Sequence, residues 1–229
     1  MPDITTASVE YPANGVGGTG HLARPDDTAS HPTVIVIQEW WGLDAHIKSI
    51  ADRFAREGFV ALAPDLYHGS FATEPDEARK LVMNMNREQA IKDLLGAVKY
   101  VRSLPQVAPK KVGCIGFCMG GSMTLALAAA TPDVAAAAPF YAGLQPPAVE
   151  LAKIEAEMFC AFGADDAGIP LENVQKFEAN LKNSNRNAVV KMYDGAPHSF
   201  FNDTRDSYRP DAAKDAWEHS LALFQRVLK

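Results

Sequence analysis

Hydrophobic residues along the chain fall into short continuous runs separated by amphipathic segments. The runs are rich in β-branched and small side chains, and they predict buried strands at 33–37, 59–63, 112–115, 134–138, 158–162 and 189–193. Strands that are covered on both faces are apolar throughout. The continuous runs therefore indicate a mainly parallel sheet.

Segments with helical spacing lie between these runs. Apolar residues recur every three or four positions before Gly58, and again in 90–104, 171–181 and 213–228. This alternation of strand and helix predicts an α/β fold with a mainly parallel central sheet flanked by helices. A length of 229 residues fits a single domain, 1–229.

The first thirty residues have a different pattern. Residues 4–11 alternate apolar and polar side chains, and residues 20–24 follow a glycine-rich turn, which predicts an antiparallel hairpin at the sheet edge. The turn also matches G-x-G-x-x-G, the spacing of dinucleotide-binding loops, at 15–20. Because Pro25 prevents the helix that such a loop must open, we interpret the segment as a hairpin turn.

Composition narrows the class of partner. The chain is 47 % hydrophobic and carries a formal net charge of −6, so it offers no basic footprint for nucleic acid or an anionic membrane. It has no apolar run of membrane-spanning length and no signal-peptide pattern, and we expect a cytoplasmic protein. The cysteines form no C-x-x-C pair and the histidines have no ligand spacing. We therefore expect a small-molecule substrate, and neither a metal nor an organic cofactor.

One cysteine lies in a motif with chemical meaning. Residues 116–120 read G-F-C-M-G, the cysteine version of the G-x-S-x-G nucleophile elbow, between a predicted strand and a predicted helix. Small neighbours permit the strained turn, and the helix N-terminus favours a thiolate at Cys118. The alternative is a buried structural cysteine, the interpretation we give to Cys114 and Cys160 within strand runs.

An elbow nucleophile requires an acid and then a histidine further along the chain. Two histidines follow Cys118. We interpret His219 as a surface residue of the last helix, whereas His198 follows the last strand run, where a general base can reach the carboxyl edge of the sheet. Asp165 and Asp166 follow the preceding run, and either carboxylate could orient the imidazole while the other caps a turn.

With these residues in order, the sequence resembles the dienelactone hydrolases, also called carboxymethylenebutenolidases, of the α/β-hydrolase fold. The resemblance runs over nearly the whole chain. It rests on the motifs Q-E-W-W-G at 38–42, A-P-D-L-Y at 63–67, G-F-C-M-G-G at 116–121, G-A-D-D at 163–166 with I-P at 169–170, and G-A-P-H-S-F at 195–200.

The resemblance implies a triad in which Cys118 is the nucleophile, His198 the base and Asp166 the orienting acid. Asp166 is selected over its neighbour because the family's acidic loop places the aspartate four residues before Pro170. The resemblance also implies that Glu39 approaches the resting cysteine and helps to control its protonation.

The oxyanion hole that the resemblance implies consists of two backbone N–H groups. One belongs to Met119, directly after the nucleophile, and the other to Trp40. The rings of Trp40 and Trp41 either form an apolar wall of the pocket or pack in the core.

The substrate anchors depart from the family pattern. The family holds a substrate carboxylate with arginines, one of them four residues beyond the catalytic histidine, where this chain has Asn202. The other position aligns with Pro75, and Arg79 or Arg205 could replace the missing arginines. We expect substrate contacts from Trp41, Arg79, Phe200 and Asn202.

These residues predict a hydrolase that cleaves ester or lactone bonds through an acyl-cysteine intermediate. One alternative is a promiscuous arylesterase or phosphotriesterase for neutral substrates, because donors aimed at an oxyanion also stabilise a phosphoryl oxygen. Another alternative is a non-catalytic ligand sensor of the same fold. A redox role for Cys118 is disfavoured because no cysteine forms a C-x-x-C pair with it.

Overall fold

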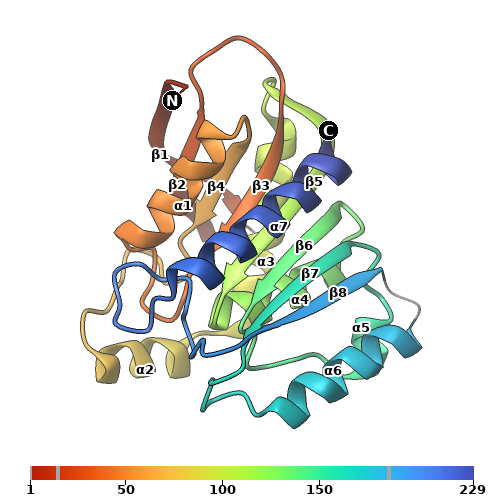
Figure 1. Cartoon of the computed structure of the whole chain (residues 1–229). Coiled ribbons are helices and arrows are strands. Elements are labelled where there is room, and N and C mark those ends of the chain that lie inside the picture. Colours follow the sequence, from red (N-terminus) through yellow and green to blue (C-terminus); the bar gives the residue numbers. More distant parts are fainter. Residues whose placement is uncertain (1, 14–15, 185–186) are drawn as a thin grey trace. The chain divides into compact units, whose positions relative to one another are not determined.

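The computed structural model describes residues 2–13, 16–184 and 187–229. In the described residues, eight strands contribute to the mixed sheet of an α/β fold, with helices between them (Figure 1). Two compact units are present, Met1–Cys114 with Leu228 and Ile115–Val227 with Lys229. The organisation of 1–229 as one domain stays a prediction.

The first unit contains an antiparallel hairpin followed by a parallel strand pair. β1 (Ile4–Ala13) pairs antiparallel with β2 (Val16–Pro25), and β2 pairs antiparallel with β4 (Val60–Pro64). β3 (His31–Ile37) is parallel to β4. β5 (Val107–Phe117) begins in this unit and ends in the other. The predicted hairpin at the edge is confirmed.

The glycine-rich segment is strand over most of its length, which corrects its interpretation as a turn. Gly17, Gly18 and Gly20 pair with β1, whereas 14–15 lie outside the described residues. A side chain at Gly18 would place its Cβ 2.3 Å from the ring of Tyr11. The glycine there lets an aromatic ring lie across the neighbouring strand.

Three helices belong to the first unit. α1 (Ala45–Arg56) buries an apolar face against β2 and β4, and α3 (Arg87–Ser103) contacts β1 and β4. The side chains of Asp44 and Asn86 cap these two helices by accepting from backbone amides. Sequence patterning did not predict α2 (Pro75–Asn84), in which Ala78 is the buried residue.

The second unit contains the parallel strands β6 (Val134–Phe140), β7 (Glu157–Gly163) and β8 (Ala188–Tyr193). Its helices are α4 (Met119–Ala130), α5 (Ala148–Leu151), α6 (Leu171–Asn183) and α7 (Pro210–Leu228). Parallel strands place all their carboxyl ends at one edge, where α/β folds bind ligands. The loops that follow these ends carry the site described below.

Helices cover both faces of β7 and β8. Phe162 of β7 packs edge-on against Phe177 of α6, whereas Phe159 stacks on His219 of α7. Because side chains three residues apart on a strand point to opposite faces, α6 and α7 lie on opposite sides of these strands. His219 itself is exposed on its helix, as predicted.

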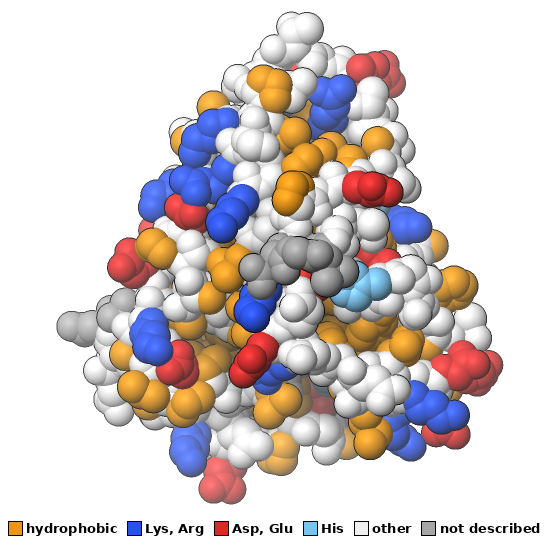
Figure 2. All heavy atoms as spheres, turned by 180° about the vertical axis from the view of Figure 1, so that it is seen from behind, with side chains coloured by type: hydrophobic (Ala, Val, Ile, Leu, Met, Phe, Trp, Pro, Cys, Tyr) orange, Lys and Arg blue, Asp and Glu red, His pale blue; other side chains and the backbone are white. Residues whose placement is uncertain are grey.

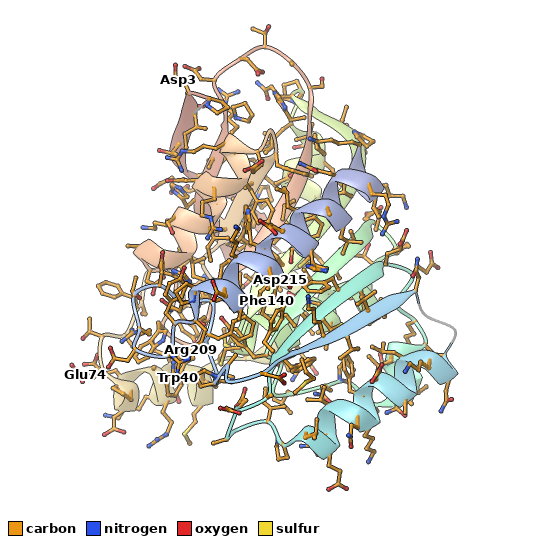
Figure 3. The ribbon with its side chains drawn as sticks, in the orientation of Figure 1. Asp3, Trp40, Glu74, Phe140, Arg209 and Asp215 are labelled. Carbon is orange, nitrogen blue, oxygen red and sulfur yellow. The ribbon has the colours of Figure 1, made fainter. Side chains whose placement is uncertain are left out.

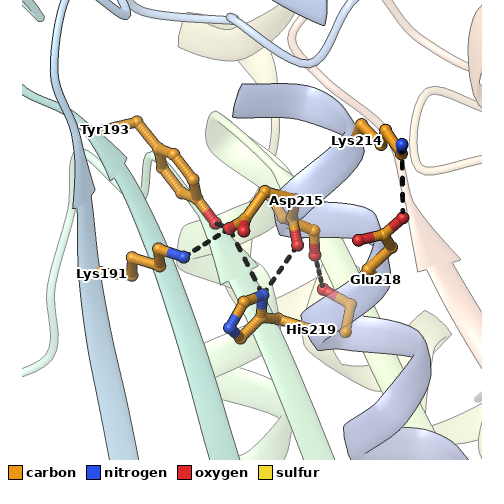
Figure 4. Close-up of polar contacts among 8 residues, drawn as sticks. Lys191, Tyr193, Lys214, Asp215, Glu218 and His219 are labelled. Atoms are coloured by element: carbon orange, nitrogen blue, oxygen red, sulfur yellow. Dashed lines mark hydrogen bonds and ion pairs between the residues drawn. The ribbon is translucent and has the colours of Figure 1, made fainter. Parts of the chain in front are cut away.

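Hydrogen bonds and ion pairs around the Asp215 side chain connect α7 to β8 (Figure 4). Lys191 Nζ and Tyr193 Oη donate to Asp215 Oδ2 at 2.5 and 2.7 Å, and His219 Nδ1 lies 3.3 Å from the same oxygen. Burial acts to raise the pKa of Asp215, but its hydrogen bonds to Lys191 and Tyr193 lower that pKa overall. The aspartate is therefore ionised where the helix meets the strand.

The surface has mixed charge. Figure 2 shows basic, acidic and hydrophobic side chains interspersed over one face. Among the helices that the structure describes, none is both long and apolar enough to cross a membrane.

Candidate active site

The turn between β5 and α4 holds Cys118 in a strained backbone conformation. Its φ is 55° and its ψ is −115°, values that non-glycine residues rarely adopt. The amide of Cys118 donates to the carbonyl oxygen of Phe140 at 3.1 Å. Phe140 is the last residue of β6 (Figure 3). The turn projects the sulfur at the N-terminus of α4, as a nucleophile elbow requires.

Close backbone contacts explain the glycines of the motif. A Cβ at Gly116 would lie 2.2 Å from the carbonyl oxygen of Gly120, and one at Gly121 would lie 2.4 Å from that of Phe140. Since no atom pair tolerates these separations, only glycine allows the turn to close against α4 and β6.

The three cysteines differ in their surroundings. Cys114 and Cys160 are completely buried, and burial raises the pKa of the Cys160 thiol. Cys118 is only half-buried. These environments agree with the assignment of Cys114 and Cys160 to the core and leave Cys118 as the cysteine that solvent can reach.

His198 and Asp166 form a short hydrogen bond. His198 Nδ1 lies 2.6 Å from Asp166 Oδ2, and the Asp166 side chain is 1 % exposed. Backbone amides of Gly168 and Ile169 donate to Asp166 Oδ1 at 2.8 and 3.1 Å. Asp165 is exposed. The structure thus joins the histidine to Asp166, the aspartate selected by its distance from the proline.

The pKa of His198 depends on both Asp166 and Cys118. Burial would by itself lower the pKa of His198, but its interactions with Asp166 and Cys118 raise it to about 10. The imidazole is protonated at neutral pH in this arrangement.

Tyr141 supports the histidine and was not predicted. Its ring centroid lies 5.0 Å from that of His198, its side chain is fully buried, and its φ is 36°. Its amide donates to the carbonyl oxygen of Ala161 at 2.7 Å. The available signal was its position directly after a strand run, which sequence patterning does not distinguish from an ordinary loop residue.

Two of the residues expected to contact substrate are buried in the second unit. Phe200 is 0 % exposed and packs against Tyr141 and Tyr193, with ring centroids 5.4 and 5.1 Å apart. Asn202 is also 0 % exposed, and its Oδ1 accepts from the amide and hydroxyl of Thr204. These contacts give both side chains a role in holding the loop that follows His198.

Three further predicted residues, Glu39, Trp40 and Trp41, belong to the first unit, whereas Met119 begins α4 in the second. Glu39 is 1 % exposed, and Trp40 and Trp41 form an edge-to-face pair at 5.1 Å. Trp41 packs with Ala72 and Ala78 in a small hydrophobic cluster. The roles of Glu39 and Trp40 toward Cys118 stay predictions.

Arg79 is exposed, and its guanidinium pairs with the exposed carboxylate of Asp76 at 3.2 Å. Arg205 follows Asn202 in the loop of the second unit and is half-buried. Over the described part of the chain, no group of three or more His, Cys, Asp or Glu side chains is placed to hold a metal ion.

Comparison with known sequences identifies relatives along the full length. The family model described as the dienelactone hydrolase family matches residues 19–228. A protein of Synechocystis sp., provisionally named a carboxymethylenebutenolidase, is 37 % identical over 99 % of each chain. Protein usf of Aquifex pyrophilus is 38 % identical over 96 % of this chain and 98 % of its own.

Solved structures give the same result. A provisionally named dienelactone hydrolase of Klebsiella pneumoniae has a TM-score of 0.91 at 29 % identity, with 98 % of this chain and 99 % of that chain covered. A dienelactone hydrolase-like promiscuous phosphotriesterase from metagenomic libraries has a TM-score of 0.91 at 25 % identity, with 99 % of each chain covered. These likenesses confirm the predicted α/β-hydrolase fold.

Proposed function

We propose that this chain, which belongs to the dienelactone hydrolase family, cleaves ester or lactone bonds through an acyl-cysteine intermediate. The family supports a hydrolase that acts on small-molecule substrates. The observations that support the cysteine mechanism are the hydrogen bond between Asp166 and His198, the effect of Cys118 on the pKa of His198, and the strained turn that holds the cysteine.

In the first half-reaction, the Cys118 thiolate attacks the substrate carbonyl carbon and a carbon–sulfur bond forms. The backbone N–H groups of Met119 and Trp40 stabilise the oxyanion. The carbonyl re-forms as the carbon–oxygen bond to the leaving group breaks, and the alkoxide takes a proton from His198. Glu39, in this proposal, controls the protonation of the resting sulfur.

In the second half-reaction, neutral His198 removes a proton from water, and the resulting hydroxide attacks the thioester. The carbon–sulfur bond breaks, the thiolate returns, and the carboxylic acid leaves. Asp166 stabilises the imidazolium in both halves through the bond to Nδ1. A neutral imidazole would protonate the leaving group poorly, so the raised pKa of His198 supports its role as the acid of the first half.

A second candidate function is the hydrolysis of neutral aryl esters and phosphotriesters. Two observations favour it. Asn202 stands where the family pattern has an arginine and is buried against Thr204, and one structural neighbour bears the name of a promiscuous phosphotriesterase. Without that arginine, a substrate carboxylate loses one charge-assisted contact, which favours neutral substrates in comparison.

Mass spectrometry of the intact protein tests the cysteine mechanism against a ligand sensor. We expect a slowly hydrolysed p-nitrophenyl ester to add one acyl group, mapped to Cys118, and we expect Cys118→Ala to lose both adduct and turnover. Cys160→Ala, which alters a buried cysteine, is the matched control and should keep the adduct. Reversible ligand binding with no adduct would instead support the sensor.

Rates on a dienelactone, a neutral aryl ester and a neutral phosphotriester rank the substrates. We expect the aryl ester to be turned over efficiently and the phosphotriester slowly, with both activities lost in Cys118→Ala. If Arg79 replaces a carboxylate anchor, Arg79→Ala raises KM for the dienelactone alone. An equal effect on both esters would remove Arg79 from substrate recognition.

A further inference from the structure

The histidine loop runs from the end of β8 to the start of α7. It leaves the strand after Tyr193 and ends at Arg209, directly before the helix. His198 divides it into a first limb, 194–197, and a second limb, 199–208. Loops are more mobile than the strands and helices that they connect, so the position of a histidine here depends on the contacts that join the two limbs.

The Arg209 side chain contacts both limbs through backbone carbonyl oxygens. Its Nε donates to Gly195 in the first limb at 3.2 Å, and its Nη1 donates to Asp206 and Tyr208 in the second limb at 3.1 and 3.0 Å. Its own amide donates to the carbonyl oxygen of Phe200 at 2.9 Å. Because a planar guanidinium fixes the directions of its N–H groups, these bonds set the separation of the two limbs.

The first limb is itself attached to the acid loop, 164–170, which follows β7. The amide of Asp165 donates to the carbonyl oxygen of Ala196 at 3.0 Å, and a Cβ at Gly163 would lie 2.1 Å from the same oxygen. The two backbones are therefore in close contact next to the proposed triad. Since Arg209 joins the second limb to the first, it also connects the second limb to the acid loop.

The backbone beside the histidine is strained. Ser199 has a φ of 58°, in the left-handed region that non-glycine residues rarely adopt. Its carbonyl oxygen accepts from the amide of Asn202 at 3.0 Å and from Ser207 Oγ at 3.2 Å. Such strain persists only where surrounding contacts maintain it. These contacts lie within the second limb, the limb that Arg209 ties to the rest of the loop.

We propose that Arg209 is a positioning residue, whose guanidinium holds the histidine loop so that the His198 imidazole stays on the carboxylate of Asp166. One hydrogen bond at Nδ1 does not prevent the imidazole from following a movement of its loop. A displacement of about 1 Å in a catalytic group can lower a rate by about 10²-fold. The effect on catalysis rests on the hydrolytic function proposed above, whereas the effect on the position of the imidazole does not.

Aromatic packing is the competing explanation for the position of the loop. Phe200 is buried and packs against Tyr141, whose ring also contacts His198. If these rings fixed the histidine by themselves, the guanidinium of Arg209 would be dispensable. A decisive experiment therefore removes the guanidinium and leaves the rings in place.

Proton NMR spectroscopy measures the position of the imidazole through the proton between His198 Nδ1 and Asp166, because a proton in a short, charge-assisted hydrogen bond resonates far downfield. We expect this signal in the wild-type protein and in Lys214→Ala, the matched control, which removes an exposed cation from α7. We expect it to broaden or disappear in Arg209→Ala. An unchanged signal in Arg209→Ala would overturn the proposal.

Steady-state kinetics with a neutral aryl ester measures the effect on catalysis. We expect Arg209→Ala to lower kcat by about 10-fold to 100-fold with KM nearly unchanged, because the histidine is displaced and substrate binding is not. Arg209→Lys keeps the charge but cannot join both limbs, so it should behave like Arg209→Ala. A raised KM with unchanged kcat, or a wild-type kcat in Arg209→Lys, would contradict the positioning role.

Thermal denaturation shows whether each variant is folded. If Arg209→Ala folds poorly, Arg209→Lys provides both measurements. The NMR signal requires no substrate and does not depend on which residue attacks it, so the positioning role and the hydrolytic function can fail separately. A loss of stability with the NMR signal and kcat intact would show that Arg209 serves the fold alone, and this too would overturn the proposal.

Discussion

Asp166 connects His198 to the backbone of the turn that follows the aspartate. Its Oδ2 lies 2.6 Å from His198 Nδ1, and its Oδ1 accepts hydrogen bonds from two backbone amides of that turn. The carboxylate is therefore fixed on one side by the backbone and on the other by the imidazole. This arrangement directs His198 Nε2 away from the aspartate. In the proposed mechanism, the acid loop therefore helps the histidine loop to set the direction of proton transfer.

Substitution of this aspartate should lower the rate of hydrolysis with little effect on the fold. We expect Asp166→Asn to reduce kcat by about 10² to 10⁴, because an amide cannot stabilise the imidazolium. Asp165→Asn is the matched control, since Asp165 is exposed and adjacent. Steady-state kinetics on an aryl ester measures both. A larger loss in Asp165→Asn would mean that the wrong carboxylate has been assigned.

The raised pKa of His198 predicts how the stability of the fold depends on pH. The pKa rises from 6.5 to about 10 on folding, so the folded protein holds the proton more tightly than the unfolded chain. The stabilising contribution of His198 should be complete below about pH 6.5 and should disappear as the pH rises through about 10. The side chain is 35 % exposed, and solvent screening limits the contribution to about 2 kcal/mol.

Urea denaturation of wild-type protein and His198→Gln over this pH range measures that contribution as a difference in the free energy of unfolding. The difference should shrink as the pH rises. A difference that is constant, or that grows toward alkaline pH, would show that the imidazole is not held protonated by its neighbours.

The turn between β5 and α4 should tolerate no side chain at position 116. We expect Gly116→Ala to lower the free energy of unfolding by about 3 kcal/mol or more, because its Cβ would lie 2.2 Å from a backbone oxygen that cannot move away alone. Gly143→Ala has no atom within 4 Å of the new Cβ and should change stability by less than about 0.5 kcal/mol. Thermal denaturation of the pair provides the test, and equal melting temperatures would contradict it.

Removal of the charge from Asp215 should loosen α7. Asp215→Asn weakens the bonds from Lys191 and Tyr193 (Figure 4), and we expect a loss of about 1 kcal/mol in the free energy of unfolding. Glu218→Gln, one turn away, removes a carboxylate that lies 3.9 Å from Lys214 and should have almost no effect. Chemical denaturation compares the two, and an equal loss would indicate a general effect of charge on the helix.

Hydrophobic runs predicted the buried strands because a strand covered on both faces must be apolar at nearly every position. β5 shows the limit of this argument. It begins at Val107, but 108–111 are exposed, so only its buried second half was recognised. α2 was missed for a related reason, since Ala78 is its buried residue and the apolar side chains of Leu81 and Val82 are only half-buried, which leaves a short apolar stripe.

The residues of the candidate site also differ in whether the sequence could predict them. Cys118 and His198 could be proposed because each follows a strand run and the elbow mechanism restricts their order along the chain, whereas Asp166 was selected over Asp165 only through the family resemblance. Tyr141 was not identifiable, because contact with His198 depends on how β6 and the histidine loop meet. Asn202 was expected at the substrate, but whether an amide faces a ligand or its own loop is decided by packing.

Close backbone contacts at the glycines on either side of Cys118 determine the shape of this turn. The Cys118 side chain makes no capping hydrogen bond to α4, so the sulfur does not help to hold the turn. In the proposed mechanism, the backbone that holds residue 118 therefore does not depend on whether the attacking atom is sulfur or oxygen. A serine at position 118 would inherit the same backbone angles, the same helix terminus and the same histidine. Exchange of sulfur for oxygen at this position would change the leaving ability and the basicity of the proposed nucleophile. The backbone contacts that hold residue 118 would stay the same, so a single substitution could change the chemistry without changing the fold.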